Sequence, residues 1–553
     1  MPHALSMPAP GFQAIILCGP GSSFPTFTAN PDENPKALIP IANRPMVWYP
    51  VDFCHRMGVT NITLITPPSS APAITAALNT NPHLTSLPLP KPTLLAPKDL
   101  EQNTGTAEIF RLPEVREAIK GDFIVLPCDL VCELGGESLL ESWMIKEAGL
   151  GGATGDSQEF TGPKMAIGGQ KSGRRGGLGV WYETKGETFI KGEETDFIAT
   201  SPIELGPVPP SKSSLLGHVS KLVYSMPTDT LNDITEEKKS LPVRHSMIRA
   251  HSRIRMLSSH RDAHIYIFPA WVLDMINSNE HMNSIGEDVV GWWAKAGWQD
   301  GLGEKLGLHE IFSTSRPDDS DDNLLENNPE QDNINYGELS TTWTSKLNSS
   351  DKQSKLVVPP ILAYVHPKNS GKLIRRVDTA PLLLNISLQL AKLESIEAVG
   401  KDASSAFAHQ FKVAHPEGIA SKTTVTRPDC LLAENVTVEE KSIIKETVIG
   451  ANCQIKTGAK LTRCVLMDGV VVGKGCRLTG CILGRRCEIG EESILQDCEV
   501  QEYLLVEART EDKNNKLMSS EGMEATEAEI QELVDDDEVI IDDGDAGLDV
   551  GFD

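Results

Sequence analysis

The most constraining feature of this sequence is a 17-residue repeat in its C-terminal third. Apolar residues recur in three rows, and each member of a row lies 17 positions after the member before it. Because the period is short and fixed, it predicts a parallel β-helix with three short strands per coil, each pointing one apolar residue inward. The rows are Leu432, Ile449, Leu466, Leu483 and Val500; Val438, Ile455, Val472 and Ile489; and Ile444, Leu461, Leu478 and Leu495.

Three cysteines follow the same period. Cys464, Cys481 and Cys498 should stack on successive coils, roughly 4.8 Å apart. The preferred interpretation is that small residues pack at a repeated position; the alternative is metal or redox chemistry. The chain has 11 cysteines and no Cys-x-x-Cys pair, so we expect no metal site. A reducing compartment fits these cysteines best.

A second informative stretch lies near the N-terminus. The unbroken apolar run from Ala14 to Cys18 predicts a buried parallel strand. Gly19 and Gly21 then predict either a phosphate-binding turn or simply a tight turn. Lys36 could bring an ammonium to the same place.

Two later residues complete a candidate nucleotide pocket. Gly105 follows Thr104, either at a ligand or in the first turn of a helix that Thr104 caps. Asp129 ends an apolar run, either at the ligand edge of the sheet or as an ordinary turn residue. We assign no catalytic and no metal-binding residue. The candidate pocket residues are Gly19, Gly21, Lys36, Gly105 and Asp129.

The N-terminal residues resemble the opening of the sugar-phosphate nucleotidyltransferases, which read Gly-x-Gly-Thr-Arg, then Pro-Lys, then a Pro-Val-x-Asn-Lys-Pro-Met-like run. In that family the arginine acts on the nucleotide triphosphate, the Gly-Thr-Ala segment meets the base and the aspartate helps to hold magnesium. This chain has Ser22 and Ser23 where the family has Thr and Arg. Serine cannot stabilise charge on phosphate as a guanidinium can, so we expect a retained scaffold without catalysis. The matching residues are Gly19, Gly21, Pro35, Lys36, Pro40, Asn43, Pro45 and Met46.

The run from Phe12 to about Val506 further resembles the gamma subunits of the guanine-nucleotide exchange factor for eukaryotic translation initiation factor two. The resemblance is carried by Phe12-Gln-Ala-Ile-Ile-Leu, Pro127-Cys-Asp-Leu130, and Arg376-Val-Asp-Thr before a leucine-rich helix. It implies an α/β fold: a Rossmann-like nucleotidyltransferase domain followed by a left-handed hexapeptide-repeat β-helix.

The same resemblance implies a cytosolic, non-catalytic subunit that needs no cofactor. It would pair with the paralogous epsilon subunit and other exchange-factor subunits, and promote GDP/GTP exchange on initiation factor two. The helical catalytic domain of epsilon is not expected after Val506. The alternative is a sugar-phosphate nucleotidyltransferase of the GDP-mannose or ADP-glucose pyrophosphorylase type, or its regulatory subunit.

Charge and composition set the expected boundaries. The formal net charge is −26, but 17 acidic and three basic residues lie between 507 and 553, and seven acidic and one basic between 315 and 337. The remaining body is nearly balanced, which argues against direct nucleic-acid binding. No leader and no membrane-spanning run is expected. The expected parts are a flexible N-terminus at 1–11, a nucleotidyltransferase-like domain at 12–377 with a disordered acidic insertion at 315–355, a helical linker at 378–415, the β-helix at 416–506, and an acidic disordered tail at 507–553.

Overall fold

The computed structural model describes residues 11–19, 23–101, 103–144, 175–185, 190, 193–203, 214–314, 358–368, 370–401 and 403–519. The chain divides into two compact units, residues 1–412 and 413–553, and each is described by itself. The expectations for residues 1–10, Gly21, the insertion at 315–355 and the tail beyond 519 lie outside the described residues.

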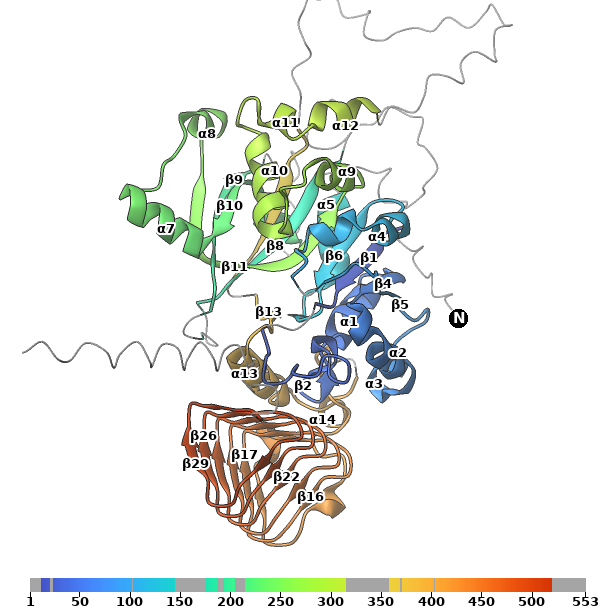
Figure 1. The fold of residues 1–553 in the computed structure, drawn as a ribbon, viewed down its shortest axis with the longest axis vertical. Helices are drawn as coiled ribbons and strands as arrows, with labels where there is room; N and C mark the ends of the chain where they lie inside the picture. Colours follow the sequence, from blue (N-terminus) through green and yellow to red (C-terminus); the bar gives the residue numbers. More distant parts are fainter. Residues whose placement is uncertain are drawn as a thin grey trace, which may run out of the picture. The chain divides into compact units, whose positions relative to one another are not determined.

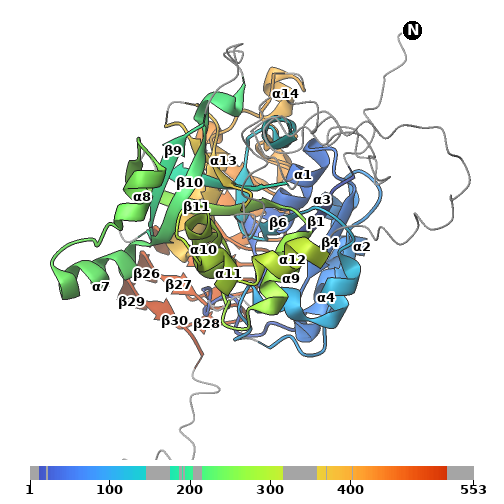
Figure 2. The same cartoon turned by 90° about the horizontal axis from the view of Figure 1, so that it is seen from above.

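The first unit is built on a nine-stranded sheet with the order β5-β4-β1-β6-β11-β8-β12-β10-β9. Its first four strands are parallel, as the apolar run from Ala14 predicts: β1 (Gln13–Leu17), β4 (Asn61–Ile65), β5 (Thr93–Leu95) and β6 (Phe123–Pro127). Figures 1 and 2 show helices along both faces of this sheet. They include α1 (Trp48–Arg56), α2 (Ala71–Thr80), α4 (Pro113–Ala118), α5 (Gly136–Trp143), α9 (Trp271–Ser278), α10 (Gly291–Ala296) and α12 (Leu308–Thr314).

The other half of the sheet closes on itself. Strand β11 (Arg255–Phe268) pairs with β9 (Asp196–Pro202) near its start and with β6 and β8 (Gly177–Glu183) near its end. Since β8, β12 (Ile361–His366), β10 (Val219–Pro227) and β9 are successive neighbours, β11 completes a ring of strands. Strand β11 is continuous, and an irregularity between Asp262 and Tyr266 lies between its pairing with β9 and its pairing with β6.

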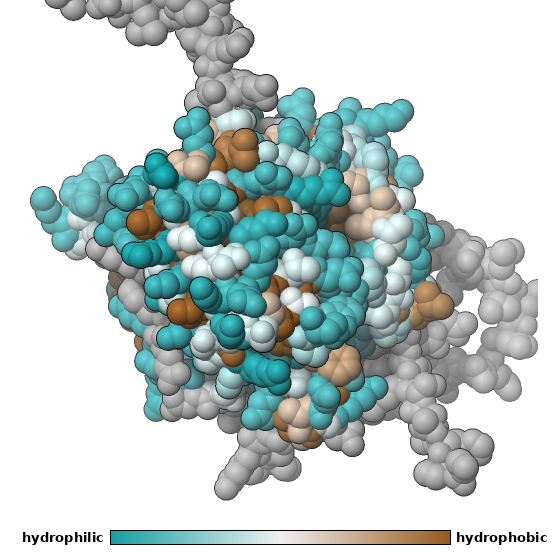
Figure 3. Space-filling model, turned by 90° about the horizontal axis from the view of Figure 1, so that it is seen from below, coloured by the Kyte–Doolittle hydropathy of each residue, from teal (hydrophilic) through white to brown (hydrophobic). Residues whose placement is uncertain are grey.

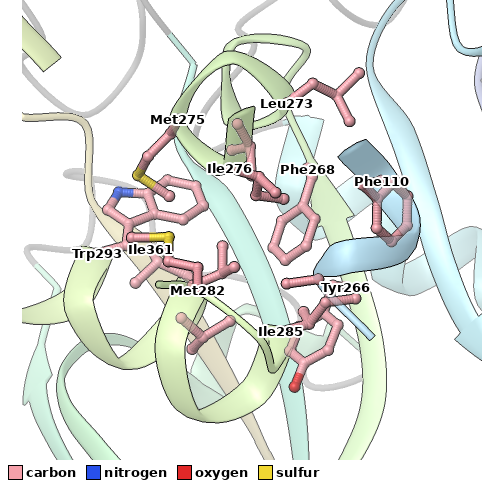
Figure 4. Close-up of a cluster of buried hydrophobic side chains, with 14 of the residues drawn as sticks. Phe110, Tyr266, Phe268, Leu273, Met275, Ile276, Met282, Ile285, Trp293 and Ile361 are labelled. Atoms are coloured by element: carbon pink, nitrogen blue, oxygen red, sulfur yellow. The ribbon is translucent and has the colours of Figure 1, made fainter. Parts of the chain in front are cut away.

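An aromatic core lies between this sheet and helices α9 and α10. Alternation along β1 and β6 points Ile15, Phe123 and Val125 into it. Figure 4 shows Tyr266 and Phe268 of β11 facing the side chains of α9 and α10. The rings of Trp271 and Trp293 meet edge to face at 4.8 Å. Of the two tryptophans near Trp293 in sequence, Trp298 is also buried, whereas Trp292 is 40% exposed.

The segment at 378–415 is more than a linker. Helix α13 (Ala380–Ala391) buries Leu382, Leu383 and Ile386, and the backbone amide of Ala42 donates a hydrogen bond to Ser387. Further along, the guanidinium of Arg44 donates to the carbonyl oxygens of residues 407 and 408. This segment therefore packs into the first unit as far as residue 412.

The second unit is a parallel β-helix, and its register is the predicted one. From Leu431 onward partner strands pair 17 residues apart, as Leu432 with Ile449 and Leu461 with Leu478 show, whereas in the first coil Val425 pairs with Ile444 at a spacing of 19. Three sheets form its sides. The first holds β15 (Leu431–Leu432), β18 (Val448–Ile449), β21 (Val465–Leu466), β24 (Ile482–Leu483), β27 (Glu499–Val500) and β30 (Lys516–Leu517). The second holds β16 (Thr437–Val438), β19 (Gln454–Ile455), β22 (Val471–Val472), β25 (Glu488–Ile489) and β28 (Leu505–Val506). The third holds β14 (Thr424–Val425), β17 (Ile443–Lys445), β20 (Lys460–Thr462), β23 (Arg477–Thr479), β26 (Ile494–Gln496) and β29 (Glu511–Lys513).

The boundary placed at Val506 falls too early. Strands β29 and β30 continue the stack to Leu517, because their backbones pair with the coil before them. The position 17 residues after Leu495 is Asp512, so a search for apolar rows misses this coil. At the other end, a bridge between Val413 and Leu432 begins the pairing before residue 416.

Every one of the 11 cysteines is buried and free. In the column that we singled out, the thiols of Cys464, Cys481 and Cys498 each donate to the carbonyl two residues earlier, at 3.2, 3.4 and 3.2 Å. Thr447 makes the same bond in the same column at 2.7 Å. A threonine there fits the packing interpretation, in which the position takes a small side chain that satisfies a carbonyl.

The face drawn in Figure 3 is mostly hydrophilic, with small, separated hydrophobic groups. None of the helices in the described ranges combines the length and the apolar content that crossing a bilayer requires.

Candidate functional site

Lys36 and Asp129 meet, as a shared site requires. Lys36 begins a short 3-10 helix (Lys36–Leu38), and Asp129 follows the carboxyl end of β6. The Nζ of Lys36 lies 2.8 Å from Oδ2 of Asp129, and the exposed fractions of the two side chains are 12% and 1%. The ammonium expected at a phosphate is therefore engaged with a buried carboxylate.

A second cation holds the other oxygen of the same carboxylate. Arg376, at the end of β13 (Ile374–Arg376), places its Nε 3.3 Å from Oδ1 of Asp129. Burial alone would raise the pKa of Asp129, but the charges of Lys36 and Arg376 outweigh it and hold that pKa well below its usual range. Asp129 is therefore a charged, doubly paired group at neutral pH. Each of its oxygens already has a cationic partner.

The network continues away from the sheet edge. Asp378 lies 3.9 Å from Arg376 and accepts a hydrogen bond of 2.5 Å from Arg261 of β11. Arg261 is nearly buried and also lies 3.6 Å from the carboxylates of Glu193 and Glu194. Burial would lower the pKa of Arg261, but the neighbouring Tyr182 and Asp378 raise it overall. The charges alternate and compensate one another, as buried charges must.

The first glycine of the candidate pocket lies beside this network. Gly19 directly follows Cys18, whose amide donates to the carbonyl of Ile65. Cys18 and Cys128 are neighbours at the ends of the paired strands β1 and β6. A hydrogen bond from Cys18 lowers the pKa of Cys128; burial opposes this, and the ammonium of Lys36 adds to it. Gly19, Lys36 and Asp129 therefore lie at one edge of the sheet.

Gly105 is positioned by packing. A Cβ built on it would lie 2.3 Å from the carbonyl oxygen of Asn283, which leaves no room for a side chain. Its amide donates to Glu108 at 2.8 Å, and the amide of Ala107 donates to the same Asn283 carbonyl at 2.9 Å. The next helix, η3, begins only at Glu108, so Thr104 does not cap it. Close backbone approach to the segment at 283 accounts for the glycine.

Sequence reasoning missed a hollow beside the network. A cavity of about 190 Å³ opens among β9, β10, β11 and residues 284–287, and it includes Arg261 and Arg376. Gly19, Lys36, Gly105 and Asp129 are not among the residues that line it. Most of its charged lining is acidic: Glu194, Asp196, Asp229, Asp262 and Glu287.

Two carboxyl groups of this lining meet at the irregularity of β11. The amide of Asp262 donates to Asp196 at 2.7 Å, and the phenol of Tyr266 donates to the Asp262 carboxylate. Burial, and then the charge of Asp196, raise the pKa of Asp262 to about 7. His264 lies between Asp262 and Tyr266 in the chain and has a φ of 51°. Burial lowers the pKa of His264 well below its usual value. The part of the chain that the structure describes holds no cluster of three or more His, Cys, Asp or Glu suited to a metal ion.

The missed partner of Asp129 left a signal in the sequence. Arg375, Arg376 and Asp378 form a compact charged run before an apolar helix. A charged run at the end of a strand that leads into a buried helix indicates paired charges, and it could have been considered as a partner for the carboxylate of Asp129 expected at the sheet edge.

Comparison with known proteins is informative for both units. Residues 426–518 match the family described as GMPPB C-terminal domain. The chain is 24% identical over 317 residues to "Translation initiation factor eIF2B subunit gamma" of Schizosaccharomyces pombe. That match covers 57% of this chain and 58% of the relative, so the chain spans less than two thirds of the relative's length. Together the two findings confirm an eIF2B gamma-like combination of a nucleotidyltransferase-like α/β unit and a β-helix.

Proposed function

We propose that this chain is a non-catalytic subunit of a guanine-nucleotide exchange complex that acts in translation initiation. The similarity to the eIF2B subunit gamma of Schizosaccharomyces pombe supports this role. In the proposed complex, the chain pairs in the cytosol with a paralogous epsilon subunit and promotes GDP/GTP exchange on initiation factor two. Epsilon supplies the exchange chemistry, and this chain helps to hold the substrate factor.

One structural observation carries the non-catalytic part of the proposal. Lys36 and Arg376 occupy both oxygens of Asp129, at 2.8 and 3.3 Å. Two cations that neutralise a buried carboxylate remove the charge that a divalent metal ion would need. Ser23 adds to this, since an exposed hydroxyl cannot replace a guanidinium at a triphosphate.

The exchange role is tested with purified components. Release of a fluorescent GDP from initiation factor two is measured with epsilon alone, with this chain alone and with both together. The proposal expects no acceleration by this chain alone and faster release by the pair than by epsilon. Equal rates for epsilon and for the pair, in a mixture where the two co-elute, would contradict it.

A second candidate function is pyrophosphorylase chemistry on a sugar phosphate, favoured by the match of 426–518 to the GMPPB C-terminal domain. That match covers the β-helix only and does not include the α/β unit, which holds the candidate nucleotide pocket. Pyrophosphate release from NTP, magnesium and mannose- or glucose-1-phosphate decides between the two. We expect none from the natural chain, and none from Ser23→Arg, because Asp129 stays paired in that variant. Robust turnover by the natural chain would favour the enzyme.

A further inference from the structure

The most unusual surface of this acidic chain is basic. Between residues 238 and 261 there are seven Lys or Arg residues, three His and no Asp or Glu, in a chain whose formal net charge is −26. The stretch covers the end of α7 (Thr228–Lys238), all of α8 (His245–Ala250) and the start of β11. Figure 1 shows α7 and α8 at the outer edge of the first unit, in green.

Six of these cations form what we call the basic surface: Lys238, Lys239, Arg244, Arg249, Arg253 and Arg255. All six are exposed, and within the described ranges none has a carboxylate partner at ion-pair distance. The helix itself is anchored, because Met247 is buried with Val223 and Trp298. Arg249 lies on this anchored helix and Arg244 directly precedes it, so a fixed element presents part of the basic surface without a carboxylate partner.

Apolar side chains are interspersed among these charges. Val243 is 40% exposed, Ile248 55%, Met256 45% and Trp292 40%. Lys295 lies over Trp292 with its Nζ 5.1 Å from the ring centroid, and over Tyr224 at 4.6 Å. Exposed aliphatic and aromatic residues between unpaired cations are typical of a docking surface.

The charge of Arg244 in the basic surface also acts on Lys295 nearby. Burial, and then the nearby charge of Arg244, lower the pKa of Lys295. Within the same stretch of chain, burial and the charge of Lys221 lower the pKa of His251. A partner that brings carboxylates here would relieve this repulsion.

We infer that the basic surface binds an acidic protein segment whose carboxylates alternate with aliphatic side chains. The carboxylates pair with Arg244, Arg249 and Arg253, and the aliphatic side chains pack on Ile248 and Met256. A nucleic acid would satisfy the cations but offers no aliphatic chain to these residues. Stacking of its bases would need free aromatic faces, and Lys295 already lies over Trp292. The inference is independent of the proposed function.

The test uses the full chain and three fluorescent probes: a peptide of repeated Glu-Asp-Leu triplets, a polyglutamate of the same length, and a single-stranded oligouridine. Fluorescence anisotropy at physiological salt should rank the Glu-Asp-Leu peptide first. Arg244→Glu/Arg249→Glu/Arg253→Glu should weaken its binding by about tenfold or more. The matched control Lys98→Glu/Lys120→Glu/Lys305→Glu reverses as many exposed charges elsewhere on the same unit and should leave binding nearly unchanged.

A second variant separates packing from charge. Ile248→Ser/Met256→Ser should lower the affinity for Glu-Asp-Leu to that for polyglutamate and leave polyglutamate binding unchanged. Thermal melts verify that each variant is folded, and Arg249→Ala/Arg253→Ala replaces the charge reversal if that variant is not. Equal losses in the basic-surface and control variants would overturn the inference, as would tighter binding of oligouridine than of either peptide.

Discussion

The two units of this protein bury different chemistry, and each therefore depends on its buried residues in a different way. The interior of the β-helix is a stack of Leu, Ile, Val and Cys, in which each coil covers the next. The sheet edge of the α/β unit buries a carboxylate between two cations, and a further arginine lies beyond them. Apolar burial stabilises in proportion to area, whereas a buried ion stabilises only while its partners remain.

This difference teaches that a carboxylate at the sheet edge is not by itself evidence of a reaction. A carboxylate at the end of β6 has a structural reason to exist, because it compensates Lys36 and Arg376. The following predictions ask whether the α/β unit needs its charges as the β-helix needs its apolar residues.

The largest effect is expected for Asp129→Asn. This change leaves Lys36 and Arg376 buried beside a neutral amide, so the free energy of unfolding should fall by about 3–5 kcal/mol. Chemical denaturation measures it. The matched control is Asp274→Asn, whose carboxylate is 49% exposed and lies 3.6 Å from Arg116. That surface pair should contribute less than about 1 kcal/mol.

The double variant Lys36→Met/Asp129→Asn sharpens this test. If the carboxylate mainly compensates the cations, removing one cation should recover part of the lost stability. Additive losses would show that Asp129 and Lys36 act independently. An Asp129→Asn protein as stable as the natural one would mean that the pairing is unimportant for the fold.

These residues also show how far sequence can lead. Along the β-helix, residue i fixes the environment of residue i+17, so row positions such as Leu461 and Leu478 were predictable one by one. Lys36 and Asp129 were predictable as neighbours, because strand ends meet at one edge of a parallel sheet. The pairing of Asp129 with Arg376 was not predictable, because it joins segments more than 240 residues apart in sequence. The basic surface, by contrast, could have been predicted by counting charged residues along the stretch from Lys238 to Arg261.

The second prediction concerns the β-helix. Leu478→Ala removes a fully buried side chain of β23 that pairs with Leu461 and Leu495 on the coils either side. The cavity and the lost burial should cost about 3 kcal/mol of unfolding free energy. Arg477→Ala, the exposed neighbour in the same strand, should change stability by no more than about 0.5 kcal/mol. Similar losses in both would mean that the rows do not define the interior.

The third prediction uses pH. Folding raises the pKa of Asp262 to about 7 from an ordinary value of 3.8, so the folded protein binds this proton more tightly than the unfolded chain. The resulting stability is present in full below the ordinary value and is lost as pH rises toward 7. Between pH 5 and 7 the loss should reach about 2 kcal/mol, and Asp262→Asn should remove it from the pH profile. The control Asp274→Asn should show the same dependence of stability on pH as the natural chain. If Asp262→Asn also showed that dependence, a group other than Asp262 would be responsible for it.

The smallest effect separates packing from binding at the predicted pocket. Gly105→Ala forces a Cβ to within 2.3 Å of the Asn283 carbonyl oxygen, whereas a Cβ on Gly19 meets nothing within 4 Å. Backbone must move at the first position and need not at the second, so Gly105→Ala should lose about 1–2 kcal/mol and Gly19→Ala should change little. Thermal and urea unfolding of both variants measure this contrast. A stable Gly105→Ala protein would remove the packing explanation for this glycine, and a strongly destabilised Gly19→Ala would show that the turn after β1 also depends on close backbone approach.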